Sequence, residues 1–438
     1  MKKITLLTAL LGLSLGSCNK DYTNPSTASQ SQVLTSSDGL IILCNGLQAR
    51  YATGGLLSVI YNAVALGGLS TNEFLILNQG NTEENNVKLG GSNVTNANGV
   101  VRNAWTQAQL VKANADVCLA NASNGAEPGT RTGIIVYASI FRALAIGTIA
   151  QFFEQTPVVV QENAPFVSRQ EALRSAIAQL ETAATELATT PVSTDFTNKI
   201  IPGINLSNTI QALIARYSLE IGDYDKALAA AGRVDLTRRS VFNFDNNARN
   251  PMFDVVFGNR NIFEPTNGNL GLSGALAPAA GDLRIPFLVR AAPLPIQNRG
   301  LGFYTANNAP IPVYVPNEML LIRAEAYARK GELANAVTEL NQVLTSTAVN
   351  PPGALPTNLP GAGLPAYAGP QTAEAILLEI LRNRNIELAF QGFRLSDSRR
   401  FGRPGPPLVM GIERNRNFYP YPRIERENNG NTPIGDPL

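Results

Sequence analysis

The chain has 438 residues, of which 44% are hydrophobic and 16% are charged, and its formal net charge is +2. This composition supports a large folded core, and it lacks the clustered Lys and Arg residues that binding to nucleic acid requires. The sequence contains no histidine, which excludes Ser-His-Asp and Cys-His nucleophile systems and imidazole-based zinc sites.

Residues 1–17 have the pattern of a signal peptide. Lys2 and Lys3 precede a largely apolar run that is too short to span a bilayer core, which needs about 20 residues. The run ends at Leu15-Gly16-Ser17-Cys18, which resembles a bacterial lipobox. The resemblance implies cleavage before Cys18 and diacylation of its thiol. Two acyl chains would hold a soluble domain stably at a membrane.

Residues 18–37 are rich in Ser, Thr, Asn and Gln, and we expect a flexible tether there, followed by one ligand-binding domain over 38–438. Lys20 and Asp21 resemble a short charged signal for display on the outer surface. The two other cysteines, Cys44 and Cys118, fall in predicted helices. We favour two buried thiols, although an oxidising compartment would also permit a disulfide.

Helical periodicity dominates the middle of the chain. An apolar helix is predicted over Ile134–Phe153, and it must end before Pro157. Ser168 and Glu171 form a capping box, and apolar residues at helical spacing continue to Leu187. These two segments predict an antiparallel helix pair.

A repeated pattern indicates the architecture. The segments Ala212–Val234 and Leu321–Val343 are similar when shifted by 109 positions, with Gly222 and Gly331 at equivalent places. Each predicts a helix, a tight glycine turn and a second helix, which is the tetratricopeptide pattern. With the pair described above and a helix over Gln371–Phe390, the sequence predicts a mostly α fold of three to four stacked helical hairpins.

Two other segments, Asn72–Val100 and Val241–Val315, are rich in Gly, Asn and Pro and contain only short β-like runs. Long insertions of this kind in a compact domain are usually functional or disordered. We therefore expect them to add minor β structure and an irregular face to the helical scaffold.

Several stretches resemble the SusD-like (RagB/SusD) surface lipoproteins of glycan-utilising Gram-negative bacteria. They are "AWTQAQLVKANADV" (104–117), "FRALAIGTIAQFFEQTPVV" (141–159), "VPNEMLLIRAEAYARKGELANAVTELNQV" (315–343), "ILRNRNIELAFQGFRLSDSRRFG" (380–402) and "NFYPYPRIERENN" (417–429). The sequence departs from the family pattern where Gln109 replaces a tyrosine and where Asn383 and Gln391 replace glutamates.

The resemblance implies a protein that is lipid-anchored in the outer membrane and faces the cell surface. Members of this family form a lid on a SusC-like TonB-dependent β-barrel transporter and capture oligosaccharides, or in some cases peptides. The resemblance implies no enzyme activity, no cofactor and no metal. Two alternatives remain open at this stage: a glycoside hydrolase, which needs two carboxylates across a cleft, and a helical scaffold that binds only protein.

If the ligand is a glycan, flat apolar side chains with polar neighbours should bind it. Phe74, Phe303 and Tyr304 lie in or beside the insertions, and Asn96 and Asn98 are candidate hydrogen-bonding partners. The alternative for each of them, that it merely anchors a loop, carries equal weight. The only tryptophan, Trp105, lies on an apolar helix face and is expected in the core.

We expect the charged residues in the matched motifs to form structural ion pairs and not to act as acids or bases. Arg384 and Glu387 lie one helical turn apart and are expected to pair with each other. The same structural role is expected for Glu318, Arg323, Glu325, Asp282 and Arg284.

Overall fold

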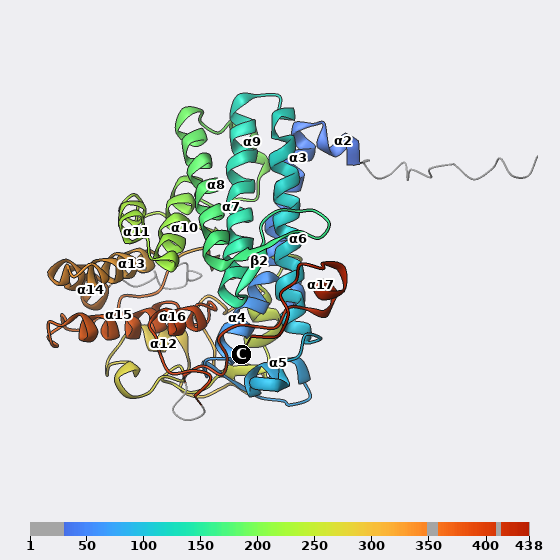
Figure 1. The fold of residues 1–438 in the computed structure, drawn as a ribbon. Helices are drawn as coiled ribbons and strands as arrows, with labels where there is room; N and C mark the ends of the chain where they lie inside the picture. The colour runs from blue at the N-terminus through green and yellow to red at the C-terminus, as the bar shows by residue number, and fades with distance from the viewer. Residues whose placement is uncertain (1–29, 348–357, 409–412, 438) are drawn as a thin grey trace, which may run out of the picture.

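The computed structural model describes residues 30–347, 358–408 and 413–437, which form a mostly helical protein (Figure 1). Four long helices stand side by side in one half of the molecule: α3 (Ser37–Ala52), α6 (Gly99–Asn121), α7 (Pro128–Phe152) and α8 (Arg169–Thr189). Cys18 and the predicted signal peptide lie outside the described residues.

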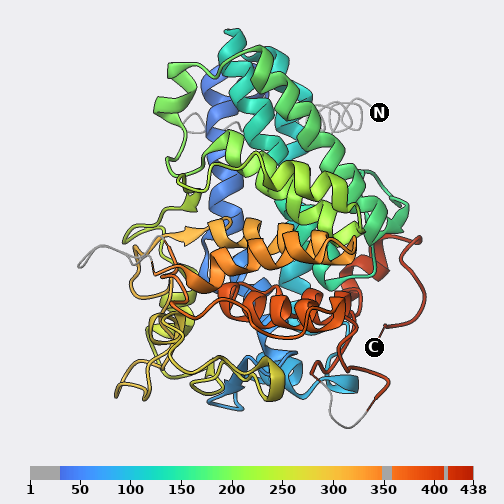
Figure 2. The same cartoon turned by 90° about the vertical axis from the view of Figure 1, so that its left-hand side faces the viewer.

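The predicted hairpins form the second half of the scaffold. Figure 2 shows them stacked: α10 (Leu206–Ile221) with α11 (Tyr224–Ala231), then α13 (Pro316–Arg329) with α14 (Leu333–Thr345). The single helix α15 (Ala373–Glu387) packs on α13 and α14, and α16 (Arg394–Arg400) follows it and packs on α4 and α7. The mostly α, tetratricopeptide-like architecture expected from the sequence is thus confirmed.

The glycine turns of the two repeats have the same geometry. Gly222 and Gly331 have φ angles of 80° and 81°, which a residue with a Cβ adopts only with strain. The N–H of Asp223 donates to the Ser218 carbonyl, and the N–H that follows Gly331 donates to the Tyr327 carbonyl, both at 2.9 Å. These are the bonds of a Schellman motif, which closes a helix at a glycine.

The described structure begins at residue 30, within the stretch predicted to be a tether. Helix α2 (Gln30–Leu34) occupies part of it, Leu34 packs against the core, and the Leu34 carbonyl accepts from the Asn124 side chain at 2.8 Å. This contact explains why the end of the predicted tether is ordered. The other short helices are α4 (Val59–Leu69), α5 (Thr82–Leu89), α9 (Thr194–Lys199), α12 (Arg284–Leu288) and α17 (Arg423–Asn428).

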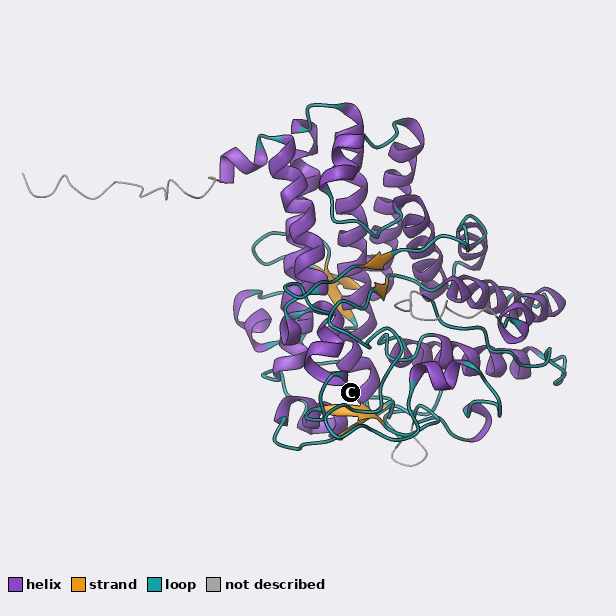
Figure 3. Cartoon of the chain, turned by 180° about the vertical axis from the view of Figure 1, so that it is seen from behind, coloured by secondary structure: helices purple, strands orange, loops and turns teal. Residues whose placement is uncertain are grey.

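The strands are short and pair in antiparallel twos (Figure 3). β1 (Phe74–Ile76) pairs with β5 (Phe263–Pro265) and so joins the two predicted insertions. β2 (Gln155–Pro157) pairs with β3 (Phe166–Ser168), and β4 (Val241–Phe242) pairs with β6 (Ile311–Pro312). The insertions are therefore irregular but packed.

Helix α7 forms the centre of the core. It is long and apolar enough to cross a membrane, but 89% of its most apolar window is buried against other parts of the protein. The expected capping box at Ser168 and Glu171 is present at the start of α8. Cys44 and Cys118 are both free and buried.

The motif charges are buried and structural, but their partners differ from those expected. Arg384 pairs with Asp397 at 2.9 Å, whereas Glu387 pairs with Arg284 at 3.0 Å. Arg284 also pairs with Asp282 at 2.7 Å, as expected for a pair that fixes a loop. The expected Arg384–Glu387 pairing was wrong because α15 is buried, and neighbouring segments supply closer partners than its own next turn does.

Candidate functional site

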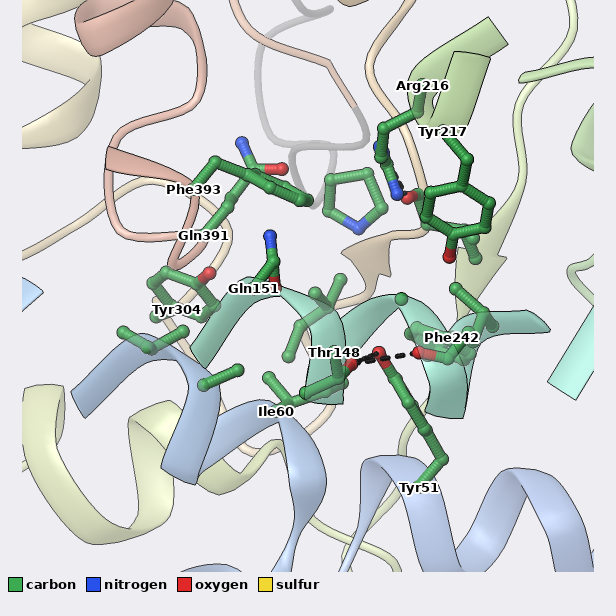
Figure 4. A pocket seen from close by; sticks show the side chains of 17 residues that line it. Tyr51, Ile60, Thr148, Gln151, Arg216, Tyr217, Phe242, Tyr304, Gln391 and Phe393 are labelled. Carbon is green, nitrogen blue, oxygen red and sulfur yellow. Dashed lines mark hydrogen bonds between the residues drawn. The ribbon is translucent and has the colours of Figure 1, made fainter. Parts of the chain in front are cut away.

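A cavity lies where the helical scaffold meets the second insertion, and we call it the central pocket (Figure 4). The space between its lining atoms, including open solvent at its mouth, is about 630 Å³. Its walls come from α3, α4, α7, α10, the strands β4 and β6, and the turn that follows α15. The lining residues used below are Tyr51, Thr148, Gln151, Arg216, Tyr217, Tyr304, Gln391 and Phe393.

Three buried tyrosines contribute aromatic surface to the pocket: Tyr51, Tyr217 and Tyr304. Each hydroxyl already has a hydrogen-bond partner. The Tyr51 hydroxyl bonds with the Thr148 hydroxyl at 3.0 Å, the Tyr217 hydroxyl donates to the Ala143 carbonyl at 3.0 Å, and the Tyr304 hydroxyl donates to the Phe390 carbonyl at 2.8 Å. Burial raises the pKa of all three phenols. They are therefore neutral, and their main contribution to a ligand is their rings.

Arg216 is the only charged side chain among the described residues that line the pocket. Its guanidinium donates two hydrogen bonds of 2.6 Å to Glu318 and lies 4.6 Å from the centre of the Phe393 ring. Burial lowers the pKa of Arg216, but the Glu318 carboxylate outweighs this effect and raises it. The charge is thus compensated, so the pocket favours a neutral ligand.

The partly exposed lining residues are Gln151, Gln391 and Phe393, which we assign to the mouth. The Gln151 amide points into the cavity (Figure 4) and forms no hydrogen bond within the described chain. The Gln391 amide N–H donates to the Glu387 carbonyl at 3.3 Å, and its oxygen stays available. Two amides beside an aromatic ring can bind hydroxyl groups on a molecule that also has apolar faces.

The central pocket contains no carboxylate side chain among its described lining residues, and the usual glycosidase chemistry needs two. Within the described chain, no group of three or more Cys, Asp and Glu side chains is placed to hold a metal ion.

The sequence-predicted ligand residues are not brought together. Tyr304 lines the central pocket. Phe74 is fully buried, 5.3 Å from the Phe390 ring centre, and Phe303 is also in the core. Neither ring offers a face to a ligand, because both insertions are packed against the core through β1 and β5.

The two asparagines anchor structure at the start of α6. The Asn98 side chain accepts from the backbone N–H groups of Val100 and Val101 at 3.1 and 3.2 Å and so caps this helix. Asn96 is half-buried, and its carbonyl accepts from the Arg423 N–H. The loop-anchoring alternative describes both residues better than ligand binding does.

Trp105 is in the core, as expected. Its indole N–H donates to Glu425 at 3.0 Å, and its ring lies 4.8 Å from the ring of Phe153. It borders a surface groove between α6 and α17 but is only 2% exposed, so it is not a free stacking platform.

Solved structures share the fold of this chain. A SusD superfamily protein from Bacteroides fragilis superposes with a TM-score of 0.67 at 16% identity, covering 91% of this chain and 99% of its own. A SusD superfamily protein from Bacteroides vulgatus superposes with a TM-score of 0.68 at 16% identity, covering 91% of this chain and 97% of its own. A SusD-like carbohydrate binding protein from Bacteroides vulgatus superposes with a TM-score of 0.65 at 17% identity, covering 84% of each chain. The fold is therefore that of the SusD superfamily.

The sequence supports the same assignment. Residues 304–433 match the model of the SusD family, and this range contains α13 to α17. No curated protein matches the chain. The family match therefore covers the C-terminal part of the chain, and the fold comparison covers most of it.

Sequence reasoning missed most of the central pocket. Tyr51, Gln151 and Tyr217 lie in ordinary helical segments, and nothing in their spacing distinguishes them from core residues. One usable signal was Gln391, a departure from the family pattern that lies at the mouth. A glutamate there would add a negative charge to a neutral pocket.

Proposed function

We propose that this chain is a surface lipoprotein that captures a neutral oligosaccharide and delivers it to a TonB-dependent outer-membrane transporter. The observation that carries the proposal is the central pocket, which combines aromatic rings, a compensated charge and two amides at its mouth. The lipobox at Cys18 and the SusD-like fold support a location at the outer membrane.

A glycan fits the pocket better than a peptide does. Sugars present apolar ring faces and hydroxyl groups without charge, and the pocket offers rings, amides and no free charge. A peptide presents two termini, and the pocket has no uncompensated charge to receive either of them. Peptide capture therefore remains the second candidate, and glycoside hydrolysis the third.

Calorimetry with a panel of neutral oligosaccharides and short peptides would test the proposal. We expect Phe393→Ala and Gln151→Ala each to weaken oligosaccharide binding about tenfold or more, because they remove a ring and an amide at the mouth. Gln371→Ala is the matched control, since Gln371 is exposed and does not line the pocket. Binding of peptides alone, or release of shortened sugars during incubation, would overturn the proposal.

Delivery to a transporter needs its own experiment. We expect a TonB-dependent barrel to co-purify with the lipidated chain from outer membranes, and growth on the bound oligosaccharide to fail when the chain is deleted. A deletion strain that grows normally on that sugar at limiting concentration would contradict the delivery step.

A further inference from the structure

Four side-chain hydroxyl groups occur among the described residues that line the central pocket, and each of them has a hydrogen-bond partner within the protein. They belong to Tyr51, Thr148, Tyr217 and Tyr304. A hydroxyl group has one proton to donate and two lone pairs that can accept. The direction of each hydrogen bond therefore decides what the group can still offer to a ligand.

Three of the four directions follow from the partner, because a carbonyl oxygen can only accept. The Thr148 hydroxyl donates to the Leu144 carbonyl at 2.9 Å. The hydroxyls of Tyr217 and Tyr304 likewise donate to backbone carbonyls. The protons of these three groups are thus engaged by the backbone, and only their lone pairs remain.

The direction at Tyr51 follows from the direction at Thr148. The two hydroxyl oxygens lie 3.0 Å apart. Since the Thr148 proton is engaged by the Leu144 carbonyl, the proton between the two oxygens is that of Tyr51. Burial raises the pKa of Tyr51, so this proton stays in place at neutral pH. The Tyr51 oxygen can therefore accept a hydrogen bond from a ligand but cannot donate one.

The hydroxyl end of Tyr51 faces the central pocket. Tyr51 is 8% exposed, and its partner Thr148 lines the pocket together with Leu144 and Gly147 of the preceding turn of α7. In Figure 4 the hydroxyl end of Tyr51 points towards the other lining residues, and its backbone end points away from them. The oxygen, and not the base of the ring, is thus the part of Tyr51 that a ligand meets.

Donors are available in the pocket on two other residues. The Gln151 amide points into the cavity (Figure 4) and forms no hydrogen bond within the described chain. Arg216 uses Nε and Nη2 for Glu318 and a backbone carbonyl, while its Nη1 is neither bonded nor fully buried within the described structure. A ligand group that only accepts could bind these donors, but against Tyr51 it would place its lone pairs opposite those of the phenol oxygen.

We propose that Tyr51 is a specificity-determining residue of the central pocket, and that its oxygen accepts a hydrogen bond from a free hydroxyl group of the ligand. The inference rests on the proposed function for the sugar class, and it adds the chemical feature of the sugar that the site requires. A sugar whose contacting hydroxyl is methylated, acetylated or replaced by fluorine cannot donate and should be rejected. The competing arrangement is a water molecule on the Tyr51 oxygen, which can donate to it whichever group the ligand carries.

NMR titration with the methyl glycosides of D-glucose, D-galactose and D-mannose would test the proposal, together with derivatives in which a single hydroxyl is replaced by fluorine. Fluorine has a size similar to that of a hydroxyl group but cannot donate. We expect at least one methyl glycoside to bind, and one of its fluorinated derivatives to bind about tenfold more weakly. Equal binding of the parent sugar and all its derivatives would overturn the proposal in favour of the bridging water.

Two variants assign the effect to Tyr51. Tyr51→Phe keeps the ring and removes the oxygen, so it should weaken the parent sugar about tenfold and bring the ratio of the two dissociation constants close to one. Thr148→Val removes the group that engages the Tyr51 proton. Tyr51 can then donate, so the loss caused by fluorine should shrink while the parent sugar still binds.

The matched control is Tyr137→Phe. Tyr137 is also buried, and its hydroxyl donates to Gln48 at 2.6 Å, but it does not line the pocket. This variant should leave the binding of both the parent sugar and the fluorinated derivative unchanged. It shows how much of any effect comes from the loss of a buried phenol hydroxyl alone.

The outcomes separate this inference from the proposed function. A fluorine effect that persists undiminished in Tyr51→Phe would overturn the role of Tyr51 and leave sugar capture standing. No binding by any neutral sugar, whether methyl glycoside or oligosaccharide, would overturn the proposed function and this inference with it.

Discussion

Arg216 on α10 and Glu318 on α13 form a buried bidentate ion pair, with both hydrogen bonds at 2.6 Å. The pair joins the two tetratricopeptide-like repeats, and its arginine also forms part of the central pocket wall. One contact therefore links the stacking of the scaffold to the shape of the candidate ligand site.

Removing one partner of this pair should be more harmful than removing both. Glu318→Gln leaves the Arg216 charge buried without its counter-charge, and we expect a loss of about 3 kcal/mol in the free energy of unfolding. The double variant Arg216→Met/Glu318→Leu, which removes both charges, should cost less. Urea unfolding of both variants measures the difference. Equal losses would show that the ion pair does not govern stability here.

Replacing glycine by alanine should have opposite effects on stability at a turn position and inside a helix. Gly331→Ala should cost about 1 kcal/mol, because its φ of 81° is strained for alanine although the space around it is open. Gly46→Ala is the matched control, since Gly46 is exposed inside α3 and an added Cβ meets nothing. It should stabilise the protein by about 0.5–1 kcal/mol. Thermal unfolding of both variants checks the two signs.

The helical scaffold could be predicted from the sequence because its signals are local. The apolar spacing after Ser168 and the glycines at 222 and 331 each specify a helix end or a turn within a few residues. Ion partners are set by tertiary packing instead. Arg284 reaches Glu387 across 103 positions of sequence, and no spacing rule on α15 could indicate it.

The candidate pocket was hidden for the same reason. The central pocket brings together Tyr51 from α3, Tyr217 from α10 and Phe393 from the turn before α16. The candidate aromatic residues Phe74 and Phe303 are buried, and loop composition does not reveal that β1 pairs with β5 and draws Phe74 inward. Whether a side chain in an insertion faces solvent depends on that pairing.

The lipid anchor at Cys18 remains a prediction of the sequence, and it is testable in cells. Cys18→Ala should abolish acylation and release the protein from the outer-membrane fraction, because a single thiol carries the proposed anchor. Cys44→Ala is the matched control, since Cys44 is a buried core residue, and it should leave the anchor unchanged. Mass spectrometry of the mature N-terminal peptide shows the outcome. An unmodified thiol at Cys18 in the wild-type protein would contradict the prediction.

Glu220 predicts how stability depends on pH. It pairs with Arg169 at 2.8 Å and with Arg400, and it accepts from the Ser396 hydroxyl at 2.9 Å. Burial alone would raise the pKa of Glu220, but Arg400 and Arg169 outweigh burial and lower the pKa to about 2, from an ordinary 4.5. Because the folded-state pKa is depressed, this stabilisation is complete above about pH 4.5 and is lost as the pH falls towards 2.

Glu220→Gln should therefore destabilise the protein by about 3 kcal/mol at neutral pH, since it removes the carboxylate that pairs with Arg169 and one of the three that surround Arg400. The difference in the free energy of unfolding between this variant and the wild type should shrink steadily below pH 4.5. In that range the wild-type carboxylate begins to be protonated in the unfolded chain. Urea midpoints measured from pH 7 to pH 3 give this curve, and Glu162→Gln, at an exposed position, should show no such deficit. A deficit that stays constant over this range would mean that packing around residue 220, and not its charge, stabilises the fold.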